Sequence, residues 1–399
     1  MSETVFGRFV PKTVSKARAA YERSRFPHRE CDPPGSPEAI NRKPSDRNAG
    51  RSVRRSGVSR SLLAATLLWL AAGPVVAEPA VAIVPLPFRV AQLRGPDSEV
   101  ALAAATSGLG RPPPGGVAVA WGDEGGAILS LDGDRVAVRP LAAEAIEALA
   151  AGETPRGAVA GSRRALSGPV SAYLSGATRG PDGLPGAAGL TVRERQPVAM
   201  SADPKPVPTH TETVTPGPDA VFAASPVRAA EIDGGLHLLA VKRQGAGSGL
   251  ALVGRDGGGW RVRAEIPPAP GGLDAAAADF DGRGRASLAL LRGTPESGRI
   301  EHWTLAGGRP ALAATAPGPF AGPDDLVAAA DLDGDGAADL VVPGPDRTAL
   351  VLLALKGGPR ERARAALPAP ARAVAILGSG RTARILVALA DGRLAEVRP

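Results

Sequence analysis

The sequence predicts an all-β protein, a β-propeller or propeller-like repeat array of about six or seven blades, preceded by a disordered tail and a signal or anchor segment. Three observations predict it. The 399 residues include 51 Gly and 40 Pro, while 44% are hydrophobic, so the chain is rich in turns and still able to build a core. Short apolar runs are separated by Asp-Gly and Gly-Gly pairs, which is typical of antiparallel hairpins. One segment plan also recurs along the C-terminal half.

The repeated segments define the expected blades. Each runs from an acidic, glycine-containing loop through three short apolar strands separated by tight turns. Three copies cover residues 229–267, 277–316 and 329–368, and a fourth, without the acidic positions, covers 373–399. Asp279 and Asp331 stand 52 positions apart, and Glu231 and Asp279 stand 48 apart. Periods of this length with three or four strands each are typical of propeller blades.

The first half of the expected array is less regular. Residues 117–141 indicate three strands, and we expect residues 78–219 to form degenerate blades before the clearer repeats of 220–399. The segment 140–153 is rich in helix formers, which predicts one helix inserted at a blade edge. The proline-spaced segment 203–219 predicts a stiff loop or linker.

The residues before position 78 have a different character. Residues 1–53 mix Pro, Arg, Ser and Asp without periodicity, which predicts a disordered basic tail, unless translation starts further along at Val53 or Val58. Residues 54–77 combine a basic flank, an apolar run and small residues at the end, the three parts of a secretory signal peptide. The alternative is a membrane anchor. The apolar stretch 62–77 contains Gly-Pro and is shorter than the ~20 residues that a spanning helix needs, so we favour cleavage.

The positive charge lies in that tail. The chain has a formal net charge of +7, but residues 1–60 hold 14 Lys or Arg against 6 Asp or Glu, which leaves 33 against 34 for the remainder. A groove that follows nucleic-acid phosphates needs clustered positive charge, so we expect no nucleic-acid partner. The only cysteine, Cys31, also lies in the tail, so the exported part needs no disulfide and has no thiolate chemistry.

The stretch DLDGDGAADLVV, residues 331–342, places four carboxylates within nine positions. Calcium takes six to eight oxygen ligands, several of them carboxylates, and carboxylates this close repel one another without a cation. We therefore expect a structural calcium ion here. The loop is not an EF-hand, because position 12 is Val342 and a strand follows it. The expected ligands at loop positions 1, 3, 5, 7 and 9 are Asp331, Asp333, Asp335, the backbone carbonyl of Ala337, and Asp339.

Two related loops carry fewer carboxylates. Asp279 and Asp281 keep positions 1 and 3, but Arg283 takes position 5, which favours an internal ion pair over a metal. Glu231 and Asp233 begin a loop that is two residues shorter. We therefore expect one good calcium site, with a weak secondary loop at Asp279 and Asp281.

These loops resemble the FG-GAP/VCBS repeat family, whose blades carry the pattern D-x-D-G-D-G-x-x-D-[LI] before an apolar strand. DLDGDGAADL at 331–340 matches it throughout, and DFDGRGRASL at 279–288 matches it in part. The similarity covers about 220–399, and the phenylalanine-glycine and glycine-alanine-proline elements that name the family are missing. The resemblance implies calcium loops that brace the strands of a propeller, in extracellular or periplasmic proteins often linked to adhesion or binding. It implies no particular ligand.

The sequence favours a non-catalytic role. None of His210, His237 and His302 lies in a zinc-type spacing, and the last two are expected to be partly exposed strand residues. No G-x-S-x-G elbow occurs. We expect a periplasmic or secreted, calcium-stabilised repeat protein with a binding, adhesion or scaffold role in the cell envelope. Its partner would be a protein or a glycan.

Two alternatives stay open. The first is a propeller enzyme of the hydrolase or quinone-dependent dehydrogenase class, acting on a small polar substrate at the central channel. Its candidate residues would be Asp123, Glu124, Arg163 and Arg164. A polar funnel in the channel would favour this enzyme, whereas a lining of Ala, Val and Gly would favour the scaffold. The second is a sensor anchored to the inner membrane by an uncleaved segment 62–77.

Overall fold

The computed structural model describes residues 78–399 except 108–112, 199–205, 295 and 323–325. The tail and the signal or anchor segment expected within residues 1–77 lie outside the described residues. The described residues belong to one compact unit of the chain. None of the helices in this part is long and apolar enough to cross a membrane.

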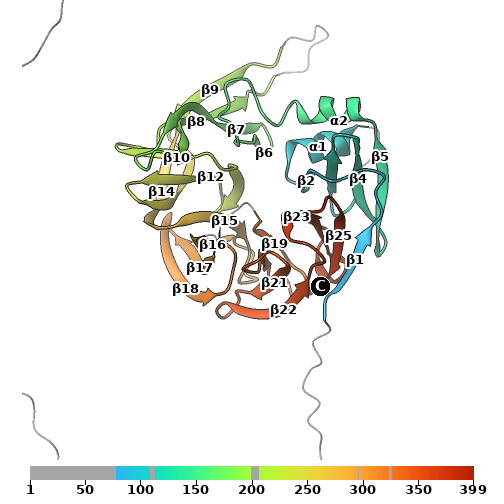
Figure 1. Cartoon of the computed structure of the whole chain (residues 1–399). Coiled ribbons are helices and arrows are strands. Elements are labelled where there is room, and N and C mark those ends of the chain that lie inside the picture. Colours follow the sequence, from blue (N-terminus) through green and yellow to red (C-terminus); the bar gives the residue numbers. More distant parts are fainter. Residues whose placement is uncertain (1–77, 108–112, 199–205, 295, 323–325) are drawn as a thin grey trace, which may run out of the picture. The chain divides into compact units, whose positions relative to one another are not determined.

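The prediction of an all-β propeller is confirmed. The strands of the described residues form four sheets of four strands and one sheet of nine. The nine-stranded sheet holds two blades that are joined through β10 (Ala220–Ala223), so this part of the chain forms six blades. Figure 1 shows the blades in a ring, with β2, β6, β15, β19 and β23 toward its centre.

Each blade runs outward from its inner strand in the order of the sequence, except that blade 6 ends with the first strand of the fold. Blade 1 consists of β2 (Gln92–Arg94), β3 (Val117–Gly122), β4 (Gly125–Asp132) and β5 (Arg135–Leu141). Blade 2 consists of β6 (Ala165–Ser167), β7 (Val170–Arg179), β8 (Pro185–Arg195) and β9 (Thr209–Val214). The prediction of a loop or linker over 203–219 is therefore wrong for residues 209–214, which form a strand because they pair with β8 at the outer edge of the blade. Blade 3 consists of β11 (Arg228–Ile232), β12 (Gly235–Gln244), β13 (Gly247–Asp256) and β14 (Gly259–Pro270). Blade 4 consists of β15 (Gly272–Ala278), β16 (Ser287–Thr294), β17 (Ser297–Ala306) and β18 (Arg309–Gly318). Blade 5 consists of β19 (Ala328–Ala330), β20 (Asp339–Pro343), β21 (Ala349–Ala354) and β22 (Arg360–Ala366). Blade 6 consists of β23 (Ala371–Leu377), the 3-10 turn η1 (Gly380–Thr382), β24 (Arg384–Leu389), β25 (Leu394–Arg398) and β1 (Ala80–Val84).

The two ends of the described chain meet in blade 6. Strand β1 pairs antiparallel with β25, from Ala80 opposite Arg398 to Val84 opposite Leu394. The sequence predicted a fourth repeat in residues 373–399 but gave no sign that residues 80–84 would complete it. The ring is therefore closed by backbone hydrogen bonds between the first and last strands.

Apolar faces of neighbouring blades form the core. Between blades 4 and 5, for example, Leu291 and Ile300 pack in one cluster with Leu340 and Val351, all at most 1% exposed. Equivalent clusters join blades 2 and 3, 3 and 4, 5 and 6, and 6 and 1. Burying one such side chain contributes about 1.5–3 kcal/mol to the free energy of unfolding, so these faces hold neighbouring blades together.

Two helices cover one face of blade 1. Helix α2 (Ala143–Ala150) confirms the helix predicted within residues 140–153, although the first two residues of that segment belong to β5. Helix α1 (Glu99–Thr106) was not predicted, even though Ser98 caps it by accepting a hydrogen bond from Ala101 N. Val100 and Ile146 of the two helices pack with Val119 of blade 1.

Candidate functional site

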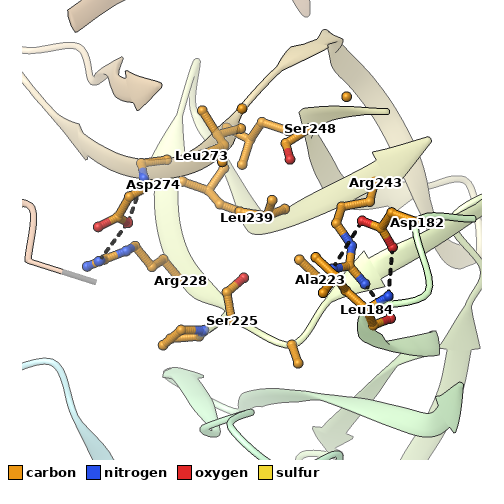
Figure 2. Close-up of a pocket in the computed structure, with 18 of the residues that line it drawn as sticks. Asp182, Leu184, Ala223, Ser225, Arg228, Leu239, Arg243, Ser248, Leu273 and Asp274 are labelled. Carbon is orange, nitrogen blue, oxygen red and sulfur yellow. Dashed lines mark hydrogen bonds and ion pairs between the residues drawn. The ribbon is translucent and has the colours of Figure 1, made fainter. Parts of the chain in front are cut away.

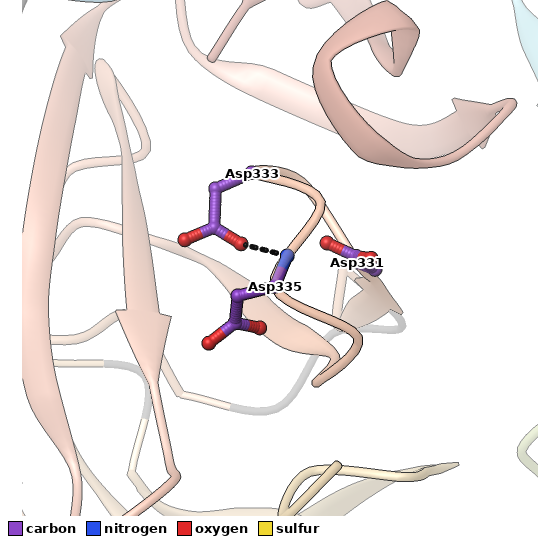
Figure 3. Close-up of side chains that lie close together, drawn as sticks. All are labelled: Asp331, Asp333 and Asp335. Carbon is purple, nitrogen blue, oxygen red and sulfur yellow. Dashed lines mark hydrogen bonds between the residues drawn. The ribbon is translucent and has the colours of Figure 1, made fainter.

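Three of the predicted calcium ligands come together in the loop between β19 and β20. Carboxylate oxygens of Asp331, Asp333 and Asp335 all lie within 4.8 Å of one another. Figure 3 shows the three side chains around the same turn of the loop. The other two expected ligands, Ala337 and Asp339, follow at the end of the loop.

The carboxylates of this loop accept hydrogen bonds from its own backbone. Asp331 accepts hydrogen bonds from Gly334 N at 2.6 Å and from Gly336 N at 3.2 Å. Asp333 accepts one from Asp335 N at 3.0 Å. Gly334 and Gly336 have φ angles of +82° and +80°, a left-handed conformation that favours glycine. The D-x-D-G-D-G spacing therefore places three negative charges on one tight, backbone-supported turn.

Two cations approach this cluster from outside the loop. Lys356 Nζ lies 3.4 Å from an oxygen of Asp335, and Arg362 Nη2 lies 2.8 Å from Asp333 Oδ2. A hydrogen bond from Ala337 N, followed by the pairing with Lys356, lowers the pKa of the Asp335 carboxyl. All four side chains of these two ion pairs are at least partly solvated, so the pairs are weak and another cation can replace Lys356 and Arg362.

Asp339 lies apart from the other three carboxylates. Its side chain is 5% exposed, and its Oδ2 accepts from Arg362 Nη1 at 2.6 Å and from Leu332 N at 3.3 Å. Burial raises the pKa of Asp339, against the opposing effect of the Arg362 guanidinium. The sequence placed Asp339 at loop position 9 but could not show this arginine, which is 23 residues away.

The same loop is bound to the next blade. Gly380 N of blade 6 donates to the carbonyl oxygen of Asp331 at 2.8 Å, and Ala338 N of blade 5 donates to that of Asp279 in blade 4, also at 2.8 Å. Gly378 N of blade 6 donates to Gly115 O of blade 1 at 3.0 Å. The loops after the inner strands thus form a chain of hydrogen bonds from blade 4 to blade 1, which the sequence did not reveal.

The two weaker acidic loops differ from one another. In the loop after β15, Asp279 accepts from Arg283 N at 3.0 Å and from Gly284 N at 2.5 Å, so Arg283 supports the turn with its backbone. After β11 the structure has a two-residue hairpin instead of a shortened acidic loop. Asp233 and Gly234 both have positive φ, 53° and 75°, because a tight two-residue turn between twisted strands needs left-handed residues.

A cavity of about 290 Å³ lies among the inner strands of the blades. One part of its wall is built from small apolar side chains of β11, β15, β19 and β23, among them Ala229, Ala276, Ala328 and Ala373. The other part is charged and belongs to blades 1 to 3: it consists of Arg94, Asp97, Glu153, Arg163, Arg164 and Arg228. The lining is therefore neither the uniformly polar funnel of the enzyme alternative nor a purely apolar channel.

The charged part of the wall is made of ion pairs. Arg94 Nε lies 2.7 Å from Glu153 Oε1, and Arg164 Nη1 lies 2.8 Å from Glu99 Oε1. Burial raises the pKa of Glu99, against the attraction of Arg164. These pairs tie blade 1 and its helix α1 to the segment that enters blade 2.

The candidate residues of the enzyme alternative do not converge. Arg163 and Arg164 line the cavity, as that alternative expected. Asp123 and Glu124 instead form the exposed turn between β3 and β4, and neither lines this cavity. His302 was expected to be partly exposed, but it is 3% exposed, because the ring of Phe280 in the loop before β16 packs against it, with ring centroids 5.9 Å apart, and it is hydrogen-bonded to Ser287 at 2.9 Å.

A larger cavity of about 520 Å³ lies where blades 3 and 4 meet the turn between β7 and β8. Figure 2 shows an ion pair at each side of it, with Leu239 between them. Arg228 lies 3.2 Å from Asp274, and Arg243 lies 3.5 Å from Asp182. Asp274 is 8% exposed and also accepts hydrogen bonds from Ala275 N and, in the segment entering blade 5, from Val327 N.

Replacing this carboxylate should destabilise the fold. In Asp274→Ala the donors of three blades lose one shared acceptor, and each buried donor left unpaired costs about 1–3 kcal/mol. We expect a loss of about 3 kcal/mol in the free energy of unfolding, measured by urea denaturation. The control is Asp182→Ala at the other side of the cavity, where the carboxylate is 27% exposed instead of 10%, so its loss should cost less than about 1 kcal/mol. Equal losses in the two variants would contradict this role of Asp274.

The comparisons with known proteins name no family for this chain. No protein-family model matches the chain, and no curated protein matches it. Among solved structures, a triple arginine-to-alanine mutant of AofleA from Arthrobotrys oligospora matches 80% of this chain and 86% of its own, with 13% identity and a TM-score of 0.39. A catalytically inactive virginiamycin B lyase from Staphylococcus aureus, solved with quinupristin, matches 81% of this chain and all of its own, with 11% identity and a TM-score of 0.42.

Proposed function

We propose that this chain is an exported, calcium-stabilised β-propeller that acts as a non-catalytic binding, adhesion or scaffold module of the cell envelope. The proposal of a calcium ion rests on the convergence of three carboxylates in the loop of blade 5. The same loop accepts a hydrogen bond from blade 6. An ion held there would stabilise the junction of two blades as well as its own loop.

The donor set of the loop suits calcium. Carboxylate oxygens are hard ligands, which calcium prefers, and solvated loops of this kind leave room for water to complete the shell. Asp331, Asp333 and Asp335 would hold the ion, while Asp339 remains paired with Arg362. Calcium would supply a double positive charge where, among the described residues, the side chains of Lys356 and Arg362 form ion pairs with the loop.

The binding or scaffold role is supported by the central cavity and the sequence. Much of the cavity wall consists of alanine, and several of its charged groups are held in ion pairs, either within the wall or with residues behind it. Export to the periplasm or the medium is supported by the signal-like segment 54–77 and by the absence of cysteine after it. The partner would be a protein or a glycan.

Thermal unfolding of the full-length protein in calcium and in EDTA tests the ion. A ligand that binds only the folded state adds about 2.7 kcal/mol at 100 times its Kd, so we expect Tm to rise by about 5 °C in calcium. Asp335→Ala should lose this response. Asp346→Ala is the matched control, because Asp346 also caps a turn of blade 5 by accepting from Thr348 N but stands outside the cluster.

Either of two outcomes would contradict the calcium site. One is an unchanged Tm of the original protein between calcium and EDTA. The other is a calcium response that Asp335→Ala retains in full, which would place the ion elsewhere on the chain.

A further inference from the structure

The cavity of about 520 Å³ where blades 3 and 4 meet the turn before β8 has the size of a small-molecule site. Four buried side chains from three strands form its apolar wall: Leu239, Val241, Leu250 and Leu273. Leu184 lines the same cavity and is 55% exposed, so the mouth is apolar as well. Such a wall favours a ligand with an apolar body, because binding removes both apolar surfaces from water.

The charged groups of this wall neutralise one another. Arg228 lies 3.2 Å from Asp274, and Arg243 lies 3.5 Å from Asp182. These are the four charged residues that line the cavity, and Figure 2 shows the two pairs at its opposite sides. A charged ligand would have to leave water for a site without a net opposite charge, which is unfavourable. The wall therefore favours a neutral ligand.

Two polar atoms of the lining residues lack a hydrogen-bond partner within the part of the chain that the structure describes. These atoms are Ser225 Oγ and Arg243 Nε, and both are buried. Figure 2 shows the hydroxyl oxygen of Ser225 pointing into the cavity, toward Leu239. Nη2 of Arg243 donates to the carbonyl oxygens of Leu184 and Pro185, which holds the guanidinium in place. Because a buried unpaired donor is unfavourable, a ligand oxygen that accepts a hydrogen bond here would be stabilised.

We propose that this cavity binds a neutral small molecule with an apolar body and a hydroxyl or carbonyl oxygen. The body lies against Leu239 and the neighbouring leucines, and the oxygen is hydrogen-bonded to Ser225. Water could pair with Ser225 but gains nothing from the apolar wall, so a ligand that offers both contacts displaces it favourably. This site goes beyond the proposed function. It does not depend on calcium, because the cavity shares no residue with the cluster of Asp331, Asp333 and Asp335.

Fluorescence titration of the full-length protein with 2-naphthol tests the site. Naphthalene has the same rings without the hydroxyl, and 2-naphthoate carries a negative charge in its place. We expect saturable binding of 2-naphthol and about tenfold weaker binding of naphthalene, which lacks the hydrogen bond. A purely apolar pocket would instead prefer naphthalene, the more hydrophobic of the two. The charged 2-naphthoate should bind most weakly of the three.

Two variants locate the bound probe. Ser225→Ala should weaken the binding of 2-naphthol about tenfold and leave that of naphthalene unchanged, since only the first uses the hydroxyl. Ala246→Trp should abolish the binding of both, because Ala246 is an exposed lining residue and a large side chain there fills the mouth. Ser297→Ala is the matched control: Ser297 is an exposed serine of β17 outside the cavity, and its loss should leave both affinities unchanged.

Three outcomes overturn the proposal. The first is that 2-naphthol does not bind, or binds no more tightly than naphthalene. The second is that 2-naphthoate binds most tightly, which would show that the site selects a charge. The third is that Ala246→Trp retains the full affinity for 2-naphthol, which would place the probe elsewhere. Because Ala246 is exposed, this variant decides the matter even if Ser225→Ala fails to fold.

Discussion

Deleting residues 80–84 should lower the free energy of unfolding by about 5 kcal/mol or more. The deletion removes β1 and all five of its residue pairs with β25. Backbone hydrogen bonds contribute about 1 kcal/mol each, and the packing of Val84, which is 7% exposed, is also lost. Such a loss approaches the total stability of many domains, so part of the protein should be unfolded at room temperature.

Urea denaturation and size-exclusion chromatography would measure this effect. The uncovered edge of β25 should also pair with other molecules, so the shortened protein should form oligomers. Ile83→Ala is the control within the same strand, because Ile83 is 41% exposed and should cost less than about 1 kcal/mol. A shortened protein that stays monomeric with an unchanged urea midpoint would contradict closure of the ring by β1.

Replacing Arg292 by Met should cost about 3 kcal/mol, because it removes the buried cation of an ion pair together with its hydrogen bonds. Arg292 in β16 is 1% exposed, and its Nε lies 3.1 Å from Glu301 Oε1 in β17. Its Nη1 also donates to the carbonyl of Ser248 in blade 3, so one guanidinium joins two blades. Arg299→Met provides the control: Arg299 binds the same carboxylate at 2.8 Å, but its side chain is 47% exposed, so its loss should cost less than about 1 kcal/mol.

The same pair predicts how stability depends on pH. Burial raises the pKa of Glu301, but the hydrogen bond from Trp303 and the charges of Arg292 and Arg299 outweigh it, so the pKa in the folded state is below its ordinary value. Glu301 therefore contributes stability above the pKa of the unfolded chain, about 4.3, and this contribution is lost as the pH falls through the lower folded value. Urea midpoints at pH 7 and pH 3 should differ less in Glu301→Gln than in the original protein. An equal or larger difference in the variant would contradict this assignment.

The fold class could be predicted because it depends on local patterns that repeat. Alternating turns and apolar runs fix the strands of each blade, and a period near 50 residues gives their grouping. The closure by β1 could not be predicted, because residues 80–84 pair with a strand about 300 positions later and carry no pattern of their own that indicates it. Helix α1 is different: the Ser98 cap and the alanines after it are a local signal from which a helix could have been predicted.

The candidate sites show the same difference between local features, which could be predicted, and long-range contacts, which could not. The three carboxylates of the loop could be predicted to converge, since their spacing and the glycines between them are local. The pairing of Asp339 with Arg362, and of Glu153 with Arg94 59 residues earlier, depends on which blades become neighbours. The order of the arginines in the sequence therefore gave no reason to expect Arg94 and Arg163 in the wall of one cavity.

The most direct test of the account is the anomalous diffraction signal of crystals grown with calcium. We predict a single strong peak enclosed by the carboxylates of Asp331, Asp333 and Asp335, at calcium–oxygen distances of about 2.3–2.6 Å. Density for water alone in this loop, with Lys356 and Arg362 still bound to Asp335 and Asp333, would contradict the claim that calcium stabilises this propeller.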